Sequence, residues 1–306
     1  MQHQVHDQTP PRRPFASSAG RGTPLMRRIV LATDLSDRAE RAQRMALLLA
    51  REHHYGLKLV YAIDTDQPTA MIDAQRDTAN FMLQRLATTI ETVDDVACSV
   101  AVVSGRGPDE AIRSAVDDTT PLIVLGSHRK RQLRDLFLGG TSERIIAHTD
   151  CPVLVVRAAP VERYRRLLLA TDLSEGSMAR ARALGATPVS AGTSTTVVHL
   201  VGTQEQSAVP AGRMTDDARD RLLAHDQAVA RERLEGFVRN ADLGAVGIRV
   251  EADTRPTATV LMEIAAHEGA DLIVLTPRQG EGLDHFLRYR TTTRLLNASP
   301  VDLLIL

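Results

Sequence analysis

Residues 27–36 read RRIVLATDLS, and residues 165–174 read RRLLLATDLS. Eight of the ten positions carry the same residue, and the two stretches lie 138 residues apart. In each stretch a continuous apolar run, typical of a buried parallel strand, ends at the polar corner ATDLS. A chain of 306 residues that contains this strand-to-loop corner twice is predicted to contain an internal repeat.

Further matched segments extend the repeat over most of the chain. They follow in the same order along both copies: 107–112 with 255–260, 121–127 with 271–277, and 143–156 with 293–306. We therefore predict two copies of one unit, at residues 25–157 and 163–306, joined by a linker at 158–162. Residues 1–24 are rich in Pro, Gly, Ser and Arg without periodicity, and we expect a disordered tail there.

Each unit alternates short apolar runs with longer amphipathic ones. In the first copy we predict strands at 28–33, 57–64, 98–105, 121–127 and 151–156, and helices at 37–54, 77–93, 108–118 and 141–148. This alternation favours the α/β class, with a parallel sheet covered by helices on both faces. Such sheets bind ligands beyond the carboxyl ends of their strands, where the strand order reverses.

The composition narrows the classes of partner. Aromatic residues make up 3% of the chain, with no Trp, and the net charge is −1, so neither base stacking nor a nucleic-acid or membrane partner is expected. Cys98 and Cys151 fit no metal or disulfide spacing, which indicates a reducing compartment. No apolar run approaches 18 residues, so we expect a cytoplasmic protein.

A basic loop with glycines at both ends follows the strand predicted at 121–127. Glycine lets main-chain N–H groups approach a phosphate closely. The candidate donors stand just before and within the start of the next predicted helix: Gly139, Gly140, Thr141 and Ser142. The cations inside the loop are Arg129, Lys130, Arg131 and Arg134. They would suit a polyphosphate, although the same residues also fit a solvated basic surface.

With both units in view, the chain resembles the universal stress protein family in its tandem two-domain form. The most specific part of the resemblance is 126–156. Nucleotide-binding members of the family have Gly, two residues, Gly, nine residues, and then Gly followed by Ser or Thr. Gly126 and Gly139 match this pattern, whereas Arg129 replaces the second glycine and Gly140 the Ser or Thr.

The resemblance implies two Rossmann-like, HUP-type domains, each with a mostly parallel five-stranded sheet flanked by helices on both faces. It further implies ATP or a related adenine nucleotide in the first unit, accompanied by Mg²⁺. The site residues that it assigns are Ala32, Thr33, Asp34, Ala62, Gly126, His128, Arg129, Gly139, Gly140, Thr141 and Ser142. Asp34 would accept hydrogen bonds from the ribose, and the main chain of Ala62 would meet the adenine. An N-cap is the alternative role for Asp34, and Arg129 either grips a phosphate or fills its place.

The second unit keeps the corner but departs from the loop. Asp172 is retained, while Thr276 replaces the first glycine, and Tyr289 with Arg290 replace the later glycine pair. Large side chains there would prevent close approach of the main chain to a phosphate. We therefore expect nucleotide in the first unit only.

Three functions remain open. A nucleotide-binding regulatory protein is favoured; a nucleotide-independent dimerising scaffold is the alternative. A slow ATPase or self-phosphorylating enzyme is third, because phosphoryl transfer needs positioned metal ligands and a base, and no catalytic residue stands out. Each unit ends in an apolar strand, VLVV (153–156) and LLIL (303–306). Unpaired, these edges would invite aggregation, so we expect the two strands to pair as a pseudo-dimer within the chain, with a homodimer of the full chain left open.

Overall fold

The fold is that of an α/β protein with one continuous sheet. The computed structural model describes residues 26–306 except 37–38, 128–140, 161, 203–214 and 277–282. The strands of the first unit are β1 (Arg28–Ala32), β2 (Gly56–Asp64), β3 (Cys98–Gly105), β4 (Ile123–Gly126) and β5 (Val153–Val156). Those of the second unit are β6 (Arg166–Ala170), β7 (Ser194–Val201), β8 (Gly247–Ala252), β9 (Leu272–Leu275) and β10 (Asp302–Ile305).

The helices alternate with these strands. In the first unit they are α1 (Ala39–His53), α2 (Thr69–Asp94), α3 (Pro108–Ser114) and α5 (Thr141–Ala147). In the second unit they are α6 (Glu175–Leu184), α7 (Asp216–Asn240), α8 (Thr257–Glu268) and α9 (Leu283–Ala298). Among the described residues, no helix has both the length and the apolar character that crossing a membrane requires.

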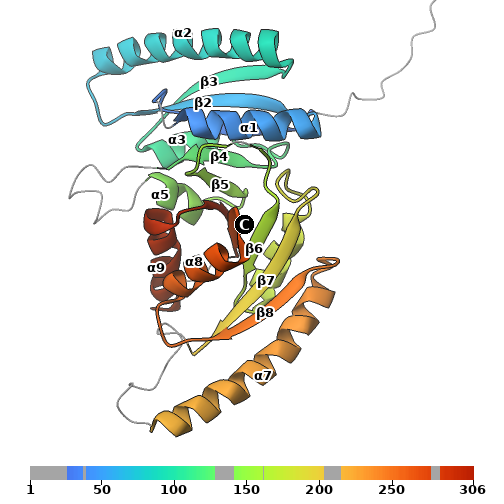
Figure 1. Ribbon diagram of the computed structural model, residues 1–306. Helices are drawn as coiled ribbons and strands as arrows, with labels where there is room; N and C mark the ends of the chain where they lie inside the picture. Colours follow the sequence, from blue (N-terminus) through green and yellow to red (C-terminus); the bar gives the residue numbers. More distant parts are fainter. Residues whose placement is uncertain (1–25, 37–38, 128–140, 161, 203–214, 277–282) are drawn as a thin grey trace, which may run out of the picture.

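The strand order confirms the predicted α/β class. The ten strands follow the order β3-β2-β1-β4-β5-β10-β9-β6-β7-β8, and every neighbouring pair is parallel except β5 with β10 (Figure 1). Each half therefore has its first strand in the middle, with later strands added on both sides. The order reverses next to β1 and β6, which are the strands that lead into the two ATDLS corners.

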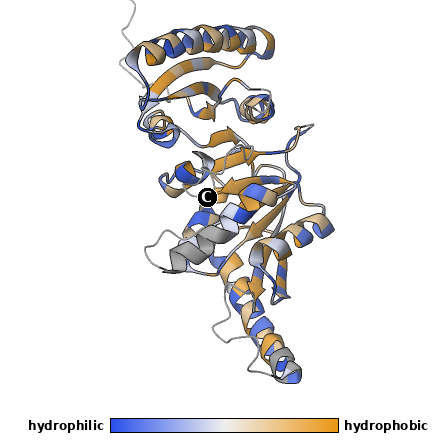
Figure 2. Cartoon of the chain, turned by 90° about the vertical axis from the view of Figure 1, so that its left-hand side faces the viewer, coloured by the Kyte–Doolittle hydropathy of each residue, from blue (hydrophilic) through white to orange (hydrophobic). Residues whose placement is uncertain are grey.

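Two hydrophobic cores lie on opposite faces of the sheet, and the strands that separate them are hydrophobic along their length (Figure 2). One core packs the strands against α1, α2, α6 and α7, and the other packs them against α3, α5, α8 and α9. Alternate residues of β1 point to the two cores: Ile29 and Leu31 to one, Val30 to the other. Burial on both faces explains why these strands are continuous apolar runs in the sequence.

The last strands of the two units join the halves of the sheet. β5 and β10 are antiparallel, with Leu154 opposite Leu304 and both side chains fully buried. The predicted pairing of the two apolar final strands is confirmed. It satisfies the main-chain groups of both strands and buries their side chains, each contributing about 1.5–3 kcal/mol relative to exposure.

A buried carboxylate fastens the linker to this joint. Asp302 begins β10 and is only 2% exposed. Its Oδ1 accepts hydrogen bonds from the main-chain N–H groups of Arg157 (2.7 Å) and Ala158 (2.9 Å), directly after β5. Its Oδ2 accepts the hydroxyl proton of Tyr164 at 2.6 Å. The Asp302 carboxylate thus holds both ends of the linker against the first residue of β10.

The pairing of β5 with β10, which we call the joint, predicts how the first unit associates when it is produced alone. A fragment of residues 26–157 would leave β5 without β10, and we expect it to dimerise through its free β5 edge. Sedimentation velocity of this fragment measures the effect, and a monomer at 100 µM would contradict it. The fragment carrying Phe81→Glu, a change on the exposed face of α2, should still dimerise through β5, which separates this pairing from any contact made by α2.

Candidate functional site

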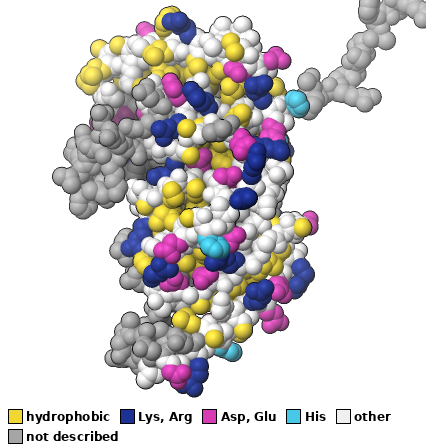
Figure 3. All heavy atoms as spheres, in the orientation of Figure 1, with side chains coloured by type: hydrophobic (Ala, Val, Ile, Leu, Met, Phe, Trp, Pro, Cys, Tyr) yellow, Lys and Arg dark blue, Asp and Glu magenta, His cyan; other side chains and the backbone are white. Residues whose placement is uncertain are grey.

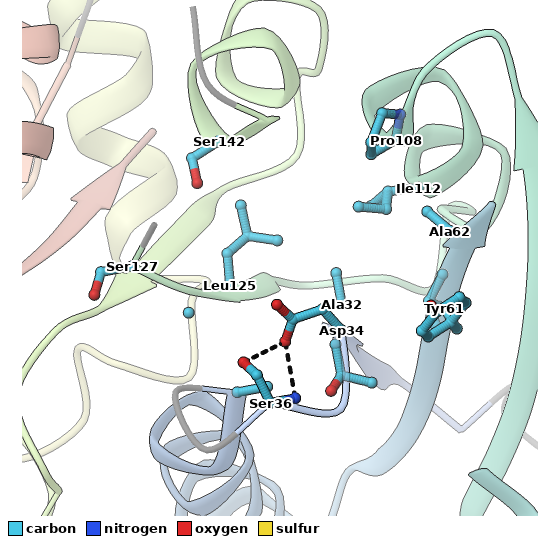
Figure 4. Close-up of a pocket in the computed structure, with 14 residues that line it drawn as sticks. Ala32, Asp34, Ser36, Tyr61, Ala62, Pro108, Ile112, Leu125, Ser127 and Ser142 are labelled. Carbon is cyan, nitrogen blue, oxygen red and sulfur yellow. Dashed lines mark hydrogen bonds between the residues drawn. The ribbon is translucent and has the colours of Figure 1, made fainter. Parts of the chain in front are cut away.

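A pocket lies at the carboxyl ends of β1, β2 and β4, on the side where the strand order of the first unit reverses (Figure 4). Its cavity is about 180 Å³. Six of the residues assigned from the sequence line it: Ala32, Thr33, Asp34, Ala62, Gly126 and Ser142. Thr141 is the first residue of α5, while His128, Arg129, Gly139 and Gly140 lie outside the described residues.

The corner after β1 is held by its own side chains. Leu35 has a φ of 60°, in the left-handed region that a leucine adopts only at a cost. Its N–H donates to Thr33 Oγ1 at 3.0 Å. Asp34 Oδ1 accepts from the Ser36 N–H at 3.0 Å and from the Ser36 hydroxyl at 2.6 Å. Short side chains at Thr33, Asp34 and Ser36 therefore fix the turn.

Asp34 stands between two chemically different walls (Figure 4). On one side lie the apolar side chains of Ala62, Pro108 and Ile112, and on the other the hydroxyls of Ser127 and Ser142. Within the described residues, both hydrogen bonds to Asp34 end on Oδ1, so Oδ2 is the oxygen that remains for a ligand. The side chain is exposed and keeps an acceptor at the middle of the pocket.

The same corner in the second unit has the same backbone. Leu173 has a φ of 61°, and its N–H donates to Thr171 Oγ1 at 3.0 Å. Asp172 Oδ1 accepts from the Ser174 N–H at 3.0 Å. Ser174 in turn caps α6, accepting a hydrogen bond from the Ser177 N–H. The repeated ATDLS sequence thus specifies a local turn in both units, whether or not a ligand is bound.

Two side chains close the second corner. Ser177 and Thr276 stand where the first unit has Ala39 and Gly126, two residues that line the pocket. The Ser177 hydroxyl is completely buried and lies 2.5 Å from Asp172 Oδ1 and 3.1 Å from Thr276 Oγ1. Thr276 Oγ1 also donates to the main-chain oxygen of Ala170 at 3.2 Å. The Asp172 carboxylate is therefore engaged by a hydroxyl of the second unit itself.

Helix α9 differs from its counterpart α5 in length. It begins at Leu283, eight residues before Thr291, the position that matches the first residue of α5. Tyr289 and Arg290 therefore lie inside a helix, where only the first four N–H groups lack an intrahelical partner. Their main-chain N–H groups bond within α9. The prediction that the second unit lacks a phosphate site thus gains a backbone argument, in addition to the bulk of the two side chains.

Both cysteines and one histidine of the described chain are held by burial. Burial raises the pKa of both Cys98 and Cys151 to about 12, which keeps the thiols protonated and poorly nucleophilic. Burial also lowers the pKa of His199, whose Nδ1 lies 2.8 Å from the main-chain oxygen of Thr171. No group of three His, Cys, Asp or Glu side chains that could hold a metal ion occurs among the residues described.

Several lining residues were not among the sequence candidates: Ser36, Ala39, Val60, Tyr61, Pro108, Ile112, Leu125 and Ser127. Most of them lie at strand ends or helix starts that only the sheet order brings together. Ala39 had a detectable signal, since it becomes Ser177 in the second copy of the repeat.

Comparisons with known proteins agree with this architecture. The model of the universal stress protein family matches the chain twice, over residues 26–157 and 163–306. A universal stress protein of Thermus aquaticus, named for its position in the QAH/OAS sulfhydrylase 3′ region, is 29% identical over 141 residues. The match covers 44% of this chain and the whole of that protein. The relative thus has the length of one unit.

Two solved structures resemble the whole chain in fold. A universal stress protein from Archaeoglobus fulgidus DSM 4304 aligns with a TM-score of 0.65 at 19% identity, covering 91% of this chain and 95% of its own. A putative universal stress protein from Pseudomonas aeruginosa UCBPP-PA14 aligns with a TM-score of 0.57 at 16% identity, covering 92% and 93%. The two family matches and the continuous sheet place this chain in the universal stress protein family, in the form that carries two units in one polypeptide.

Proposed function

We propose that the first unit binds ATP or a related adenine nucleotide and that the protein acts as a nucleotide-responsive regulator. The observation that carries the proposal is the position of Asp34, an exposed carboxylate between an apolar wall and a hydroxyl wall. A nucleoside phosphate carries matching groups in the same order: a flat apolar base, a ribose diol and an anionic phosphate tail.

The fit can be followed along the pocket. The base would lie against Ala62, Pro108 and Ile112, where small and apolar side chains leave room for a ring. The ribose hydroxyls would donate to Asp34 Oδ2, since carboxylates accept such bonds strongly. The phosphates would extend past Gly126 toward the Ser142 hydroxyl, and toward the basic loop whose residues lie outside the described chain.

The proposed role is binding rather than catalysis. Phosphoryl transfer requires metal ions and a base placed beside the transferred group. With no cluster of three metal-binding side chains among the described residues, Mg²⁺ would be held mainly by the phosphate oxygens of the nucleotide. The residues around Asp34 would then orient the nucleoside and contribute little to bond cleavage.

The test of this proposal is direct. In the first experiment, protein purified without added nucleotide is denatured, and the released small molecules are identified by mass spectrometry. In the second, ATP, ADP and AMP are titrated into folded protein and binding is measured by calorimetry. We expect micromolar binding of at least one of them, weakened by Asp34→Ala about tenfold through the loss of a charge-assisted hydrogen bond. Absence of both copurified and titratable nucleotide would refute it.

The stoichiometry is expected to be one nucleotide per chain. The first unit has the open pocket, whereas Ser177 and Thr276 occupy the matching space in the second unit. Calorimetry of the full chain measures the number of sites directly. The variant Asp34→Ala should weaken this single site, and Asp172→Ala should leave the affinity unchanged. Two equivalent sites would show that the second corner opens.

The second unit is better suited to a nucleotide-independent scaffold role. Its corner is satisfied by its own hydroxyls, and its last strand completes the sheet of the first unit. We therefore assign the two functions considered for this family to different halves of one chain: ligand binding to the first, and support of the sheet to the second.

A further inference from the structure

α2 carries more exposed large hydrophobic side chains than any other element of the described chain. Seven large hydrophobic side chains are exposed in the part that the structure describes, and four of them belong to α2: Met71, Phe81, Met82 and Val93. Phe81 is 65% exposed. α2 forms one end of the molecule, beyond β3, in both ribbon views, and hydrophobic side chains gather at that end in the space-filling view (Figures 1, 2 and 3).

Helix geometry places Phe81 opposite the buried side of α2, while Met71, Met82 and Val93 lie about 80–120° around the helix axis from it, all on one side. The buried residues of α2 are Ala79, Leu83, Ala87 and Ile90. At 3.6 residues per turn, Phe81 points almost directly away from them. The exposed residues on the same line are small, with Ala70 and Ala74 before Phe81 and Thr88 and Thr92 after it. A second helix could therefore approach closely on both sides of the phenyl ring.

The threonine hydroxyls of α2 are satisfied by hydrogen bonds within the helix, so this face needs less water than its sequence suggests. Four hydroxyls donate to the main-chain oxygen four residues earlier, at 2.7–3.0 Å: those of Thr78, Thr88, Thr89 and Thr92. Hydroxyls that are satisfied within their own helix need no water or partner group when the surface is covered. Covering this face with another protein surface would therefore leave no threonine hydroxyl unsatisfied.

The charges of this face are complementary to those of a second copy. Asp77 and Arg85 are exposed and lie four residues before and four residues after Phe81. Phe81 is also at the middle of α2, which runs from Thr69 to Asp94. In an antiparallel pair of α2 helices crossing at Phe81, Asp77 of one copy lies opposite Arg85 of the other, twice by symmetry. Arg85 already lies over the Phe81 ring, 5.8 Å from its centroid.

The other exposed surfaces fit a second copy less well. The β5 and β10 edges pair with each other and are not available. The other long helix, α7, exposes Leu222 and Val229, but ion pairs within the helix, such as Arg221 with Asp217, flank them. The described part of α7 therefore offers two exposed large hydrophobic side chains, against four on α2.

We propose that the full chain forms a homodimer through antiparallel packing of α2 against α2 of a second copy, centred on Phe81. A helix of 26 residues is about 39 Å long. One such helix pair buries less surface than a standard protein interface, so the dimer is expected to be weak, with a dissociation constant on the order of 10 µM.

The experiment uses sedimentation equilibrium of the full chain from 1 to 300 µM. The wild type should dimerise, and Phe81→Glu should weaken association at least tenfold because it buries a charge at the centre of the contact. Val229→Glu, on the exposed face of α7, is the matched control and should associate like the wild type. Thermal unfolding of each variant verifies that the fold is unchanged.

Charge reversal tests the antiparallel register. Asp77→Arg alone places Arg opposite Arg, and Arg85→Asp alone places Asp opposite Asp, so each variant should associate less than the wild type. An equimolar mixture restores both opposite-charge pairs and should form the heterodimer with an affinity near that of the wild type.

Each contrary outcome overturns the proposal. A wild-type chain that stays monomeric at 300 µM shows that this face does not bind a second copy. Association that survives Phe81→Glu shows that the dimer uses another surface. Failure of the charge-reversed mixture to associate, while the wild type dimerises, excludes the antiparallel register. None of these outcomes depends on whether the first unit binds nucleotide.

Discussion

Nucleotide binding is expected to fall at least about 100-fold when the first unit receives the two side chains that close the second, Ala39→Ser together with Gly126→Thr. In the second unit the matching Ser177 and Thr276 lie 3.1 Å apart and fill the space beside Asp172. In the first unit the new hydroxyls would engage Asp34 and occupy the pocket. A loss of this size corresponds to about 2.7 kcal/mol of binding free energy.

The double substitution Ala39→Ser, Gly126→Thr is expected to leave the fold intact. Serine and threonine occupy the matching positions 177 and 276 of the second unit, so calorimetry should report lost binding with little change in melting temperature. Ala228→Ser with Gly236→Thr, two substitutions on α7 far from the pocket in the sheet order, controls for the added bulk and hydroxyls. Unchanged affinity in Ala39→Ser, Gly126→Thr would mean that nucleotide binds elsewhere.

The largest loss of stability is expected from Asp302→Ala. Removing this carboxylate leaves the N–H groups of Arg157 and Ala158 and the hydroxyl of Tyr164 without their acceptor in a buried site. Removing one side of such a buried network costs about 3–5 kcal/mol. We expect a melting temperature roughly 10 °C lower, measured by calorimetry.

Asp271→Ala is the matched control. Asp271 also accepts two main-chain N–H groups, from Arg165 at 2.7 Å and Arg166 at 3.1 Å, but it is less buried. Water can replace its hydrogen bonds, so its loss should cost only about 1 kcal/mol. Equal effects of the two substitutions would show that burial of Asp302 adds nothing to the joint.

The pH dependence of the joint follows from the same burial. Burial raises the pKa of Asp302 above its ordinary value of 3.8, although the hydrogen bonds from Tyr164 and two N–H groups act to lower it. The stability that this raised pKa provides is fully present below 3.8 and is lost as the pH rises through the folded-state pKa. The wild type should therefore lose stability relative to Asp302→Asn as the pH is raised above 3.8, measured by thermal unfolding at a series of pH values.

The sequence predicted the strands closely because both faces of the sheet are buried. β3 was predicted at its observed bounds, and the other strands of the first unit within a few residues. The start of α2 was predicted eight residues late, at Asp77 instead of Thr69. The first ten residues of α2 include no buried side chain, so no apolar period marks them.

The pocket was predictable where it depends on the repeated corner. Thr33 and Asp34 were found because ATDLS follows a recognisable strand in both copies. Pro108 and Ile112 were missed because they belong to α3, more than 70 residues along the chain from Asp34, and only the position of β1 in mid-sheet brings α3 to the same edge. Ser177 was missed because serine and alanine differ by one atom, yet its hydroxyl reaches both Asp172 and Thr276.

The β5–β10 joint gives this chain a freedom that a symmetric dimer lacks. Two identical subunits joined through their last strands would carry every substitution at both corners at once. In this protein the same antiparallel pairing occurs within a single polypeptide. Gly126 and Thr276 are therefore encoded separately, and one corner can fill with side chains while the other keeps its cavity. The tandem chain thus retains the sheet of a two-fold symmetric dimer, while its two corners can differ in sequence.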